Sequence, residues 1–405
     1  MRLLGLLLAT PLVLAAPLLE AKGKAIPGKW IVVMKEDYEA GAVSSNKRGI
    51  LNTVESLVTP RHTYNMGSFK AFAINASDEM VSKILKLDGV AHIEPDVMVE
   101  TASVASQSNS PWNLARISST EPNTSTYVYD DSAGEGTYTY IIDTGIFIEH
   151  PEFEGRATWG TSFVADDQKP TVDENGHGTH VAGIAGSKTY GVAKKTNLIA
   201  VKVLNGAGSG PISQIIAGIQ WVVDDAKSKN RMNKSVANLS LGAISIGNSS
   251  MSLAAGAAVD QGLFISAAAG NLQTPVEFFS PAQYPTVCSI AATARNDSRA
   301  YFSNYGNGVD LFAPGVDVTS TYNNGSTATL SGTSMAAPHV AGLGAYLLGL
   351  EGDRDPIALC ERMQELAPKD IVTNSMSPNN IVAYNGEDSS LQGSLENLLE
   401  KLESK

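Results

Sequence analysis

The sequence feature that most constrains this fold is an alternation between β-branched runs and helical patterns, which begins at Thr137. Such alternation predicts a parallel sheet covered by helices on both faces. Parallel sheets place reactive side chains at the carboxyl ends of their strands, so we expect any chemistry along that edge. The predicted strands span residues 137–142, 197–204, 236–241, 263–267 and 287–291, and the predicted helices span 178–186, 212–227 and 250–261.

A smaller unit is predicted ahead of this α/β domain. Residues 29–34, 70–74 and 90–93 read as strands, and residues 79–87 carry apolar side chains at helical spacing. The following segment 101–110, TASVASQSNS, is small, polar and uncharged, which is typical of an exposed linker. We therefore expect a small α+β unit that a linker joins to the larger domain.

The two ends of the chain carry patterns of their own. Residues 1–16 combine a positive start, a short apolar run and a small-residue cleavage site, which predicts a signal peptide rather than a membrane span. Residues 386–405 place leucines at helical spacing, which predicts an amphipathic tail packed on the body, with partner contact or self-association as the alternative. Export would put Cys288 and Cys360 in an oxidising compartment, where one disulfide is commoner than two thiols.

The net charge limits the kinds of partner that the chain can bind, and Asn-x-Ser/Thr motifs indicate where it can carry glycans. The 405-residue chain has a formal net charge of −12, which argues against a nucleic-acid partner. Asparagines in Asn-x-Ser/Thr motifs are plausible glycan sites where they are exposed. They are Asn75, Asn123, Asn233, Asn238, Asn248, Asn296 and Asn324, of which Asn238 is a poor acceptor because it lies on a predicted buried strand.

The stretch 331–340, SGTSMAAPHV, surrounds Ser334 with residues too small to form a packing surface. One explanation is a tight turn that leads into a closely packed helix. The other is chemical, because the first N–H groups of a helix have no intrahelical partner and can hold a developing negative charge. The rest of the chain decides between the two.

A nucleophilic serine needs a base, and the histidines offer few candidates. His339 is structural in this interpretation, because five residues along a helix turn a side chain by about 140°. His62 and His92 lie in the N-terminal unit. His177 and His180 remain as the strong candidates, in NGHGTH at 175–180, and a metal pair is disfavoured because no glutamate lies between them.

A catalytic histidine needs a hydrogen-bond acceptor that holds it in one tautomer. YIIDTG at 140–145, an apolar strand that ends in a carboxylate, offers one. A carboxylate at the end of a buried strand is costly unless it is paired. We predict that Asp143 orients His180 and that His180 takes the proton of Ser334, a triad of orienter, base and nucleophile.

The residues Asp143-Thr-Gly145, His177-Gly-Thr-His180 and the stretch 332–338 resemble, in this order, the three active-site signatures of subtilisin-like serine proteases. PWNLARISS at 111–119 and HPEFEGRA at 150–157 are similar to the fungal proteinase K group. The resemblance covers residues 111–385. It implies a three-layer subtilisin-like α/β domain over 105–385 with a central, mostly parallel sheet, and a secreted serine endopeptidase.

Residues 29 to about 100 similarly resemble the inhibitory propeptide of these enzymes, by pattern and position, which implies a propeptide over residues 17–104. The resemblance implies that the propeptide occupies the cleft until the enzyme itself cuts within residues 100–106. The expected partners are protein and peptide substrates and the chain's own propeptide, with no nucleic acid, no membrane and a monomeric state. A vacuolar processing protease of the same fold is the nearer alternative, and an inactive binding protein, which would normally lack a site residue, is the other.

The resemblance also assigns the cleft. Asn271 matches the second oxyanion donor beside the Ser334 N–H, with an ordinary turn asparagine as the alternative. The residues that match the substrate-binding walls are Gly208, Ser209, Gly210, Ser240, Leu241, Gly242, Ala268, Ala269 and Gly270. Walls this small leave a roomy apolar pocket, so aromatic and aliphatic side chains are expected before the scissile bond.

The carbonyls of Pro285 and Val287 with the Asp310 carboxylate resemble a structural calcium site, and Asp310 as an ordinary loop cap is the alternative. No cofactor beyond Ca²⁺ is implied. Cys288 and Cys360 fall where the proteinase K group has a disulfide. The chain departs from that group where Tyr138 and Val181 replace cysteines, which removes a second disulfide and a free thiol, and its leucine tail has no counterpart there.

Overall fold

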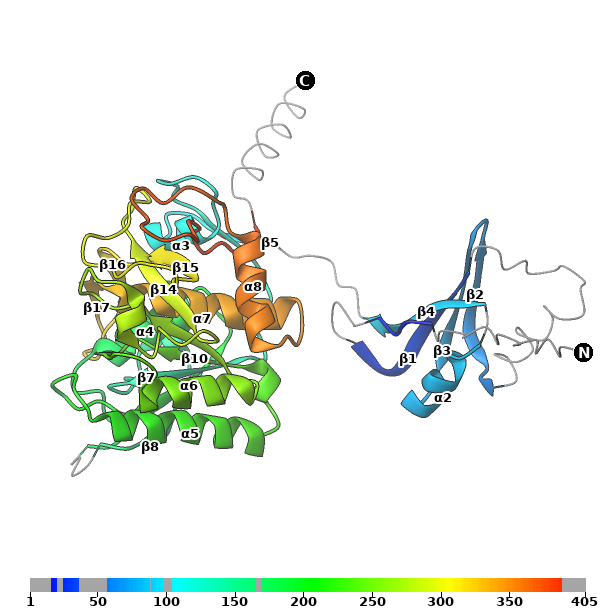
Figure 1. Cartoon of the computed structure of the whole chain (residues 1–405), viewed down its shortest axis with the longest axis horizontal. Coiled ribbons are helices and arrows are strands. Elements are labelled where there is room, and N and C mark those ends of the chain that lie inside the picture. The colour runs from blue at the N-terminus through cyan, green and yellow to red at the C-terminus, as the bar shows by residue number, and fades with distance from the viewer. Residues whose placement is uncertain are drawn as a thin grey trace, which may run out of the picture. The chain divides into compact units, whose positions relative to one another are not determined.

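The computed structural model describes residues 16–19, 25–35, 57–87, 89–97, 104–164 and 169–387. The chain divides into two compact units, Met1–Thr101 and Ala102–Lys405 (Figure 1). Apart from Ala16, the predicted signal peptide lies outside the described residues, as does the leucine tail beyond Glu387.

The N-terminal unit is an antiparallel sheet with one described helix. The sheet order is β2-β3-β1-β4, and every described pairing within it is antiparallel. Its core is formed by apolar side chains from the strands and from the helix, among them Val32, Phe72 and Ile84. The predicted α+β unit is therefore confirmed. Its elements are β1 (Ala25–Met34), β2 (Pro60–Met66), β3 (Phe69–Asn75), α2 (Asp78–Ile84) and β4 (Val90–Val97).

The second unit is built on a seven-stranded sheet of order β15-β14-β12-β10-β7-β9-β8. All six neighbouring pairs are parallel. The predicted strands form the inner part of this sheet, and the edge strands β8 and β15 join them. The strands are β7 (Tyr138–Asp143), β8 (Ala157–Ser162), β9 (Asn197–Lys202), β10 (Ser235–Leu239), β12 (Phe264–Ala268), β14 (Cys288–Thr293) and β15 (Leu311–Pro314).

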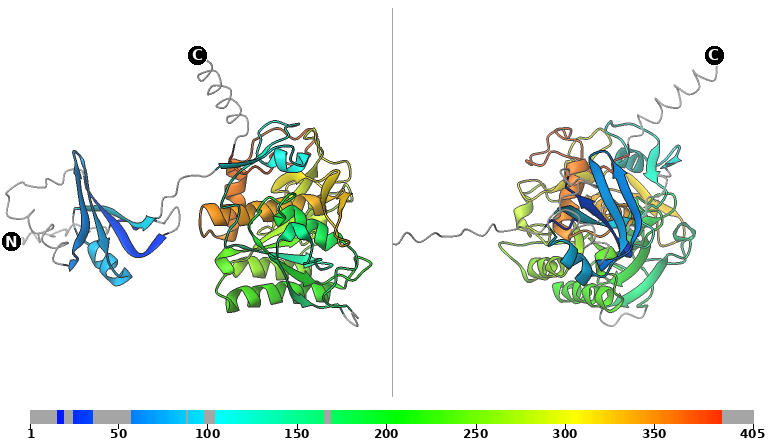
Figure 2. Two further views of the ribbon diagram at one scale, coloured as in Figure 1. Left: turned by 180° about the vertical axis from the view of Figure 1, so that it is seen from behind. Right: turned by 90° about the vertical axis from the view of Figure 1, so that its right-hand side faces the viewer.

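Helices cover both faces of this sheet, which confirms the predicted three layers (Figures 1 and 2). Strand β7 shows how the faces are assigned, because its side chains alternate. Tyr140 and Ile142 join the core cluster that holds the apolar side chains of two helices, while Ile141 joins the cluster on the opposite face. The first pair of helices is α5 (Ile212–Ser228) and α6 (Ser250–Asp260), and the opposite pair is α4 (His177–Gly186) and α7 (Thr333–Leu350).

Smaller elements complete the unit. The hairpin of β16 (Val318–Thr321) and β17 (Thr327–Leu330) contacts α4. Helix α8 (Pro356–Leu366) follows its N-cap residue Asp355, whose side chain accepts hydrogen bonds from the N–H groups of Ile357 and Ala358.

Among the described residues, no helix has the length and apolar character that crossing a bilayer requires. The remaining elements are α3 (Trp112–Ile117), η1 (Pro151–Phe153), η2 (Met232–Lys234), β11 (Ala243–Ile244), η3 (Val276–Phe278) and β13 (Phe279–Ser280).

The prediction of an exposed linker over 101–110 is wrong for residues 104–107. These residues form strand β5 (Val104–Gln107), which pairs antiparallel with β6 (Tyr127–Asp130) in the second unit. The Gln107 side chain also donates to the Thr189 carbonyl at 3.1 Å. Small polar residues leave a backbone free to join a sheet edge, and composition alone does not reveal this. The predicted division after residue 104 therefore lies inside β5, and the structure divides the chain after Thr101.

Candidate active site

Strand β7 ends at Asp143, a fully buried carboxylate, and the side chain that meets it is His177. His177 Nδ1 donates to Asp143 Oδ1 at 2.8 Å and lies 3.0 Å from Oδ2. Burial disfavours the charged ring, but the charge and hydrogen bond of Asp143, with the charge of Asp173, outweigh burial and raise the pKa of His177. The arrangement leaves Nε2 of His177 as the nitrogen available for proton transfer.

Local sequence explains why the first residue of α4 reaches the strand end. Helix α4 begins behind Gly176, which has φ +101°, a conformation that favours glycine. The next glycine, Gly178, lies so close to the loop after β7 that a Cβ there would collide with the Gly145 carbonyl oxygen. The glycines of the two motifs therefore let the helix start press against the end of β7, which brings His177 to Asp143.

Asp173, which belongs to none of the sequence motifs, holds this arrangement together. Its carboxylate is 3% exposed and accepts the hydroxyl of Thr144, directly after Asp143, at 2.9 Å. It also accepts the N–H groups of Asn175, Gly176 and Thr179, and the Thr179 hydroxyl. One buried carboxylate thus fixes both the strand end and the helix start.

The prediction that Asp143 orients His180 is wrong. His180 lies one turn deeper in α4 and is fully buried, where its Nε2 donates toward the carbonyls of Val318 and Ala328 at 3.2 and 3.1 Å. Burial lowers the pKa of His180 to about 4, and the neighbouring His177 acts in the same direction. Its Nδ1 has no partner among the described residues. His180 therefore joins α4 to the β16–β17 hairpin, and among the described residues it makes no hydrogen bond with Asp143.

His339 is structural, as predicted. Its ring is fully buried, with Nδ1 donating to the Met335 carbonyl and Nε2 accepting from Asn113, both at 2.8 Å. Burial lowers the pKa of His339 to about 3. The ring therefore stays neutral and joins α7 to α3.

Ser334 is the second residue of α7, at the same edge of the sheet. Its Oγ donates to the Ser240 carbonyl at 3.1 Å, and Ser240 Oγ donates back to the Ser334 carbonyl at 2.7 Å. Among the described residues, Ser334 makes no hydrogen bond with His177. Catalytic hydrogen bonds are often loose without substrate and tighten in the complex. Ser240 and His177 line one pocket, which brings the serine and the histidine to a common site.

Asn271 lies beside the start of α7 with its amide oriented by Thr333. Its Oδ1 accepts both the N–H and the hydroxyl of Thr333 at 2.8 Å. Its Nδ2 makes no hydrogen bond among the described residues. A Cβ placed on Gly332 would lie 3.4 Å from Asn271 Nδ2 and 3.6 Å from the backbone nitrogen of Ser334. The nitrogens of two N–H donors thus lie close to one point that the glycine keeps clear.

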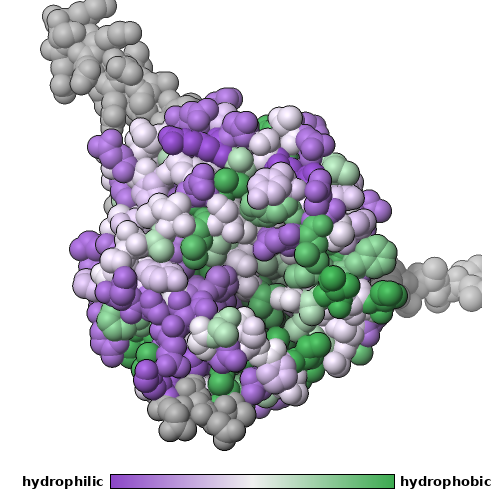
Figure 3. All heavy atoms as spheres, turned by 90° about the vertical axis from the view of Figure 1, so that its left-hand side faces the viewer, coloured by the Kyte–Doolittle hydropathy of each residue, from purple (hydrophilic) through white to green (hydrophobic). Residues whose placement is uncertain are grey.

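A pocket of about 420 Å³ adjoins these groups. Its apolar lining includes Leu204, Ile212, Ile215 and Met251. Figure 3 shows the face at this edge of the sheet, on which apolar side chains gather around a hollow. The predicted wall residues that line the pocket are Gly208, Ser209, Gly210, Ser240, Leu241 and Gly242.

Comparison with known proteins identifies the family. A model of the subtilase family matches residues 134–389, and a model of the peptidase inhibitor I9 family matches residues 29–102. The chain belongs to the subtilase family. This subtilase is a serine endopeptidase, with an N-terminal unit of the inhibitor I9 type.

Relatives and solved structures agree with the family. A "Cuticle-degrading protease" of Metarhizium anisopliae is 43% identical over 401 residues, which cover 95% of this subtilase and 100% of the relative. A "Subtilisin-like protease 1" of Arthroderma gypseum is 42% identical, covering 90% of this chain and 77% of the relative. The crystal structure of a cold-adapted subtilisin-like serine proteinase is 38% identical with a TM-score of 0.64, covering 69% of this subtilase and 99% of that chain.

The last predicted wall, Ala268, Ala269 and Gly270, is buried and does not line the described pocket. A residue that the sequence analysis missed lies between the two walls. Side chains added at Gly242 or at Gly270 would both collide with the Phe279 ring. Phe279 therefore lies against both glycines, and its position after η3 gave no sequence signal of that contact.

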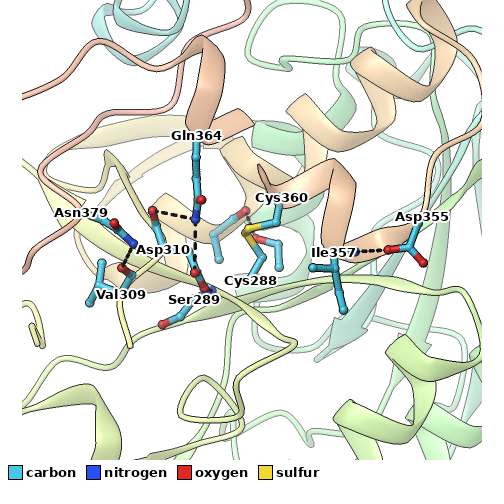
Figure 4. The surroundings of a disulfide bond; sticks show 11 residues. Cys288, Ser289, Val309, Asp310, Asp355, Ile357, Cys360, Gln364 and Asn379 are labelled. Atoms are coloured by element: carbon cyan, nitrogen blue, oxygen red, sulfur yellow. Dashed lines mark hydrogen bonds between the residues drawn. A yellow bond between two sulfur atoms is a disulfide. The ribbon is translucent and has the colours of Figure 1, made fainter. Parts of the chain in front are cut away.

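The predicted Cys288–Cys360 disulfide is confirmed; it joins β14 to α8 (Figure 4). The Asp310 carboxylate lies beside this disulfide. Burial raises the pKa of Asp310 to about 6, although hydrogen bonds from the Ser289 N–H at 2.8 Å and from the Gln364 side chain act to lower it. No cationic side chain of the described residues pairs with this carboxylate. The buried hydroxyls of Ser289 and of Thr286, which lies between Pro285 and Val287, have no hydrogen-bond partner within the part of the chain that the structure describes. An oxygen-rich setting with a largely buried, uncompensated carboxylate fits a bound Ca²⁺.

Proposed function

We propose that this subtilase cleaves internal peptide bonds with Ser334 as nucleophile, His177 as base and Asp143 as orienter. The observation that carries the assignment is the bond from His177 Nδ1 to the buried Asp143. His177 lines the same pocket as Ser240, whose carbonyl accepts the Ser334 hydroxyl. The base is thus His177, in place of the predicted His180. The triad logic is otherwise unchanged.

The proposed reaction follows from the placement of each atom. Ser334 Oγ leaves the Ser240 carbonyl, attacks the substrate carbonyl carbon and passes its proton to His177 Nε2. Asp143 holds Nδ1–H and stabilises the positive ring that results. His177 then gives the proton to the leaving amine, and water reverses the sequence to release the acid and restore Ser334.

Asn271 Nδ2 and the Ser334 N–H are the proposed donors to the oxyanion. Their nitrogens lie 3.4 and 3.6 Å from a Cβ position on Gly332, and Thr333 holds the amide through its oxygen. Fixed donors aimed at a developing charge are worth more than flexible ones, because they need no reorganisation during reaction. Neither donor has another hydrogen-bond partner among the described residues.

The decisive experiment is labelling with a serine-directed fluorophosphonate, followed by N-terminal sequencing. Wild type should label and begin within residues 100–106. Ser334→Ala and His177→Ala should neither label at a comparable rate nor mature, while His180→Gln should do both. A mature wild type that stays unlabelled would overturn the protease assignment and favour an inactive binding protein of the same fold.

The proposed specificity is broad, with a preference for aromatic and aliphatic side chains before the scissile bond. Leu241, the wall glycines and Phe279 make the surroundings of that position apolar, and none of the predicted wall residues is charged. Peptide anilides that differ only in the residue before the cut test this. Leucine and phenylalanine should exceed lysine and glutamate in kcat/KM by at least tenfold, and a preference for lysine would contradict the proposal.

We propose export and self-processing on the signal pattern of residues 1–16 and on the I9-type unit. The N-terminal unit would inhibit the enzyme until the cut. Mature protein in the culture medium supports this proposal, and mature protein confined to the vacuole favours the alternative of a vacuolar processing protease. Glycan mapping should find sugar only on exposed sequons and none on Asn238, which is fully buried.

The Ca²⁺ site is proposed on the carbonyls of Pro285 and Val287 and the Asp310 carboxylate. A bound cation would neutralise Asp310, whose raised pKa means that ionisation costs folding free energy as pH rises through about 6. Thermal unfolding of inhibited enzyme tests the site. Ca²⁺ should raise Tm more at pH 8 than at pH 5, and Asp310→Asn should abolish the difference; an equal shift in both proteins would overturn the site.

A further inference from the structure

Asn304 is a fully buried asparagine whose side chain contacts the loop that carries Asn271. Neither the motifs nor the triad accounts for it. It lies in the segment 302–305, which runs alongside residues 273–276. The Gln273 N–H donates to the Phe302 carbonyl, and the Tyr305 N–H donates to the Thr274 carbonyl.

The side chain of Asn304 holds the loop on both sides of Asn271. Before Asn271, Asn304 Nδ2 donates to the Ala269 carbonyl at 2.7 Å, and the Asn304 backbone N–H donates to the Gly270 carbonyl at 2.9 Å. After Asn271, Asn304 Oδ1 accepts the N–H of Leu272 at 3.0 Å and the N–H of Thr274 at 3.1 Å. The side-chain amide of Asn304 therefore binds the loop backbone both before and after Asn271.

This arrangement needs a carboxamide of this length. The amide supplies a donor for one arm of the loop and an acceptor for the other, whereas a carboxylate would set an oxygen against the Ala269 carbonyl. Gly270, with φ +104°, has Asn304 Nδ2 where a side chain would otherwise lie. The glycine before the oxyanion asparagine is thus explained by the close approach of Asn304.

We propose that Asn304 is a positioning residue for transition-state stabilisation, which fixes the backbone on both sides of Asn271 so that its amide meets the oxyanion. The inference rests on the proposed role of Asn271. Asn304 touches no reacting atom and acts only through the loop. A displacement of a catalytic group by about 1 Å costs on the order of 100-fold in rate.

A double-mutant cycle on mature enzyme from the full chain tests the proposal. Asn304→Ala should lower kcat by about 10- to 100-fold with KM within about threefold, because ground-state binding does not use the oxyanion donors. Asn271→Ala should lower kcat by about 100-fold or more. In the Asn271→Ala background, the Asn304 substitution should cost less than about threefold, because the group it positions is gone.

The outcomes separate the two ideas. If Asn271→Ala leaves kcat unchanged, the oxyanion role of Asn271 fails, and the role of Asn304 fails with it. If Asn271→Ala is impaired but the Asn304 effect is equally large in both backgrounds, or absent in wild type, only the positioning role is overturned. Asn304→Ser, which keeps a donor and an acceptor, decides the test in the same way if Asn304→Ala does not fold.

The matched control is Asn385→Ala. Asn385 is 3% exposed, and its Nδ2 donates to the Val128 carbonyl at 2.8 Å, a contact outside the site. Its loss should lower Tm while kcat stays within about twofold. Affinity for a peptide aldehyde, which forms a tetrahedral adduct, should fall in Asn304→Ala in parallel with kcat. A fall in kcat of the same size in Asn385→Ala would overturn the positioning role.

Discussion

Helices α4 and α7 begin at the same edge of the sheet, each behind a glycine, but their first N–H groups are satisfied differently. In α4, four successive N–H groups donate to side-chain oxygens. The pairs are Gly176 with Asp173, His177 with Asn175, Gly178 with Thr144, and Thr179 with Asp173. In α7, Thr333 donates to Asn271, but the Ser334 N–H has no partner among the described residues.

The difference shows how the start of a helix can help to stabilise a positive charge in one case and a negative charge in the other. A helix start attracts anions through its free N–H groups. At α4, the Asp173 carboxylate already fills that place, and with Asp143 it favours a positive ring on His177. At α7 the start stays open, so it can receive the negative oxygen of a tetrahedral intermediate.

The largest effect should come from removing the basic group at the α4 start. His177→Ala should lower kcat by about 10⁶-fold, and Asp143→Asn by about 10⁴-fold, the losses known for equivalent residues in serine proteases. Precursor maturation and peptide hydrolysis both report the loss. Substantial activity in His177→Ala would mean that α4 does not supply the base.

The next effect concerns the open start of α7. Gly332→Ala should lower kcat by about 10²- to 10³-fold, the scale of losing one oxyanion donor, because its methyl group would lie between the two donors. The contacts of that methyl group are ordinary van der Waals distances, so Tm should change little. An active Gly332→Ala enzyme would show that the oxyanion does not bind there.

A smaller effect is expected when the charge that closes the α4 start is removed. Asp173→Asn should lower the pKa of His177, since the Asp173 charge helps to raise it. Neutral His177 is the proposed base, so the acid limb of the kcat/KM profile should move to lower pH. Lost cap bonds should also cost about 1–3 kcal/mol of stability.

The matched control for that change is Glu174→Gln. Glu174 is the adjacent carboxylate and pairs with Lys169 at 3.1 Å, outside the α4 cap. Its pH profile should match wild type. An unmoved acid limb in Asp173→Asn would contradict an electrostatic contribution of Asp173.

The smallest effect on activity should come from His180→Gln, with kcat within about tenfold of wild type. The effect on stability should depend on pH. The pKa of His180 is about 4 when folded and near 6.5 when unfolded, so its contribution to stability is lost as pH falls from 6.5 toward 4. Urea unfolding of fluorophosphonate-inhibited enzymes should show a shallower acid dependence in the variant, and an unchanged slope would contradict this origin.

Much of the fold could be predicted because the inner strands are apolar on both faces. The edge strand β8, ATWGTS, and the short strand β15, LFAP, lack a long β-branched run, so their place in the sheet depends on their neighbours. Strand β5 was missed for a related reason. Its pairing with β6 is a long-range contact that local composition does not encode.

The residue types of the site and their place at the sheet edge could be predicted, but the choice of the histidine that contacts Asp143 could not. The motifs placed a carboxylate at a strand end and two histidines at a helix start. The choice between the histidines depends on the contact of Gly178 with Gly145, which decides which turn of α4 reaches Asp143. Asp173 and Asn304 act through backbone N–H and carbonyl groups, so neither has a motif that identifies it.

The disulfide has a consequence for the lifetime of the enzyme. The Cys288–Cys360 bond closes a loop of 72 residues that contains Asn304 and Ser334 but neither Asp143 nor His177. Closing such a loop restricts the unfolded chain by about 4 kcal/mol in the entropic model. A protease is surrounded by copies of itself, and a segment that opens is a segment that can be digested. The covalent loop therefore limits self-digestion of the segment that carries Ser334, the proposed nucleophile.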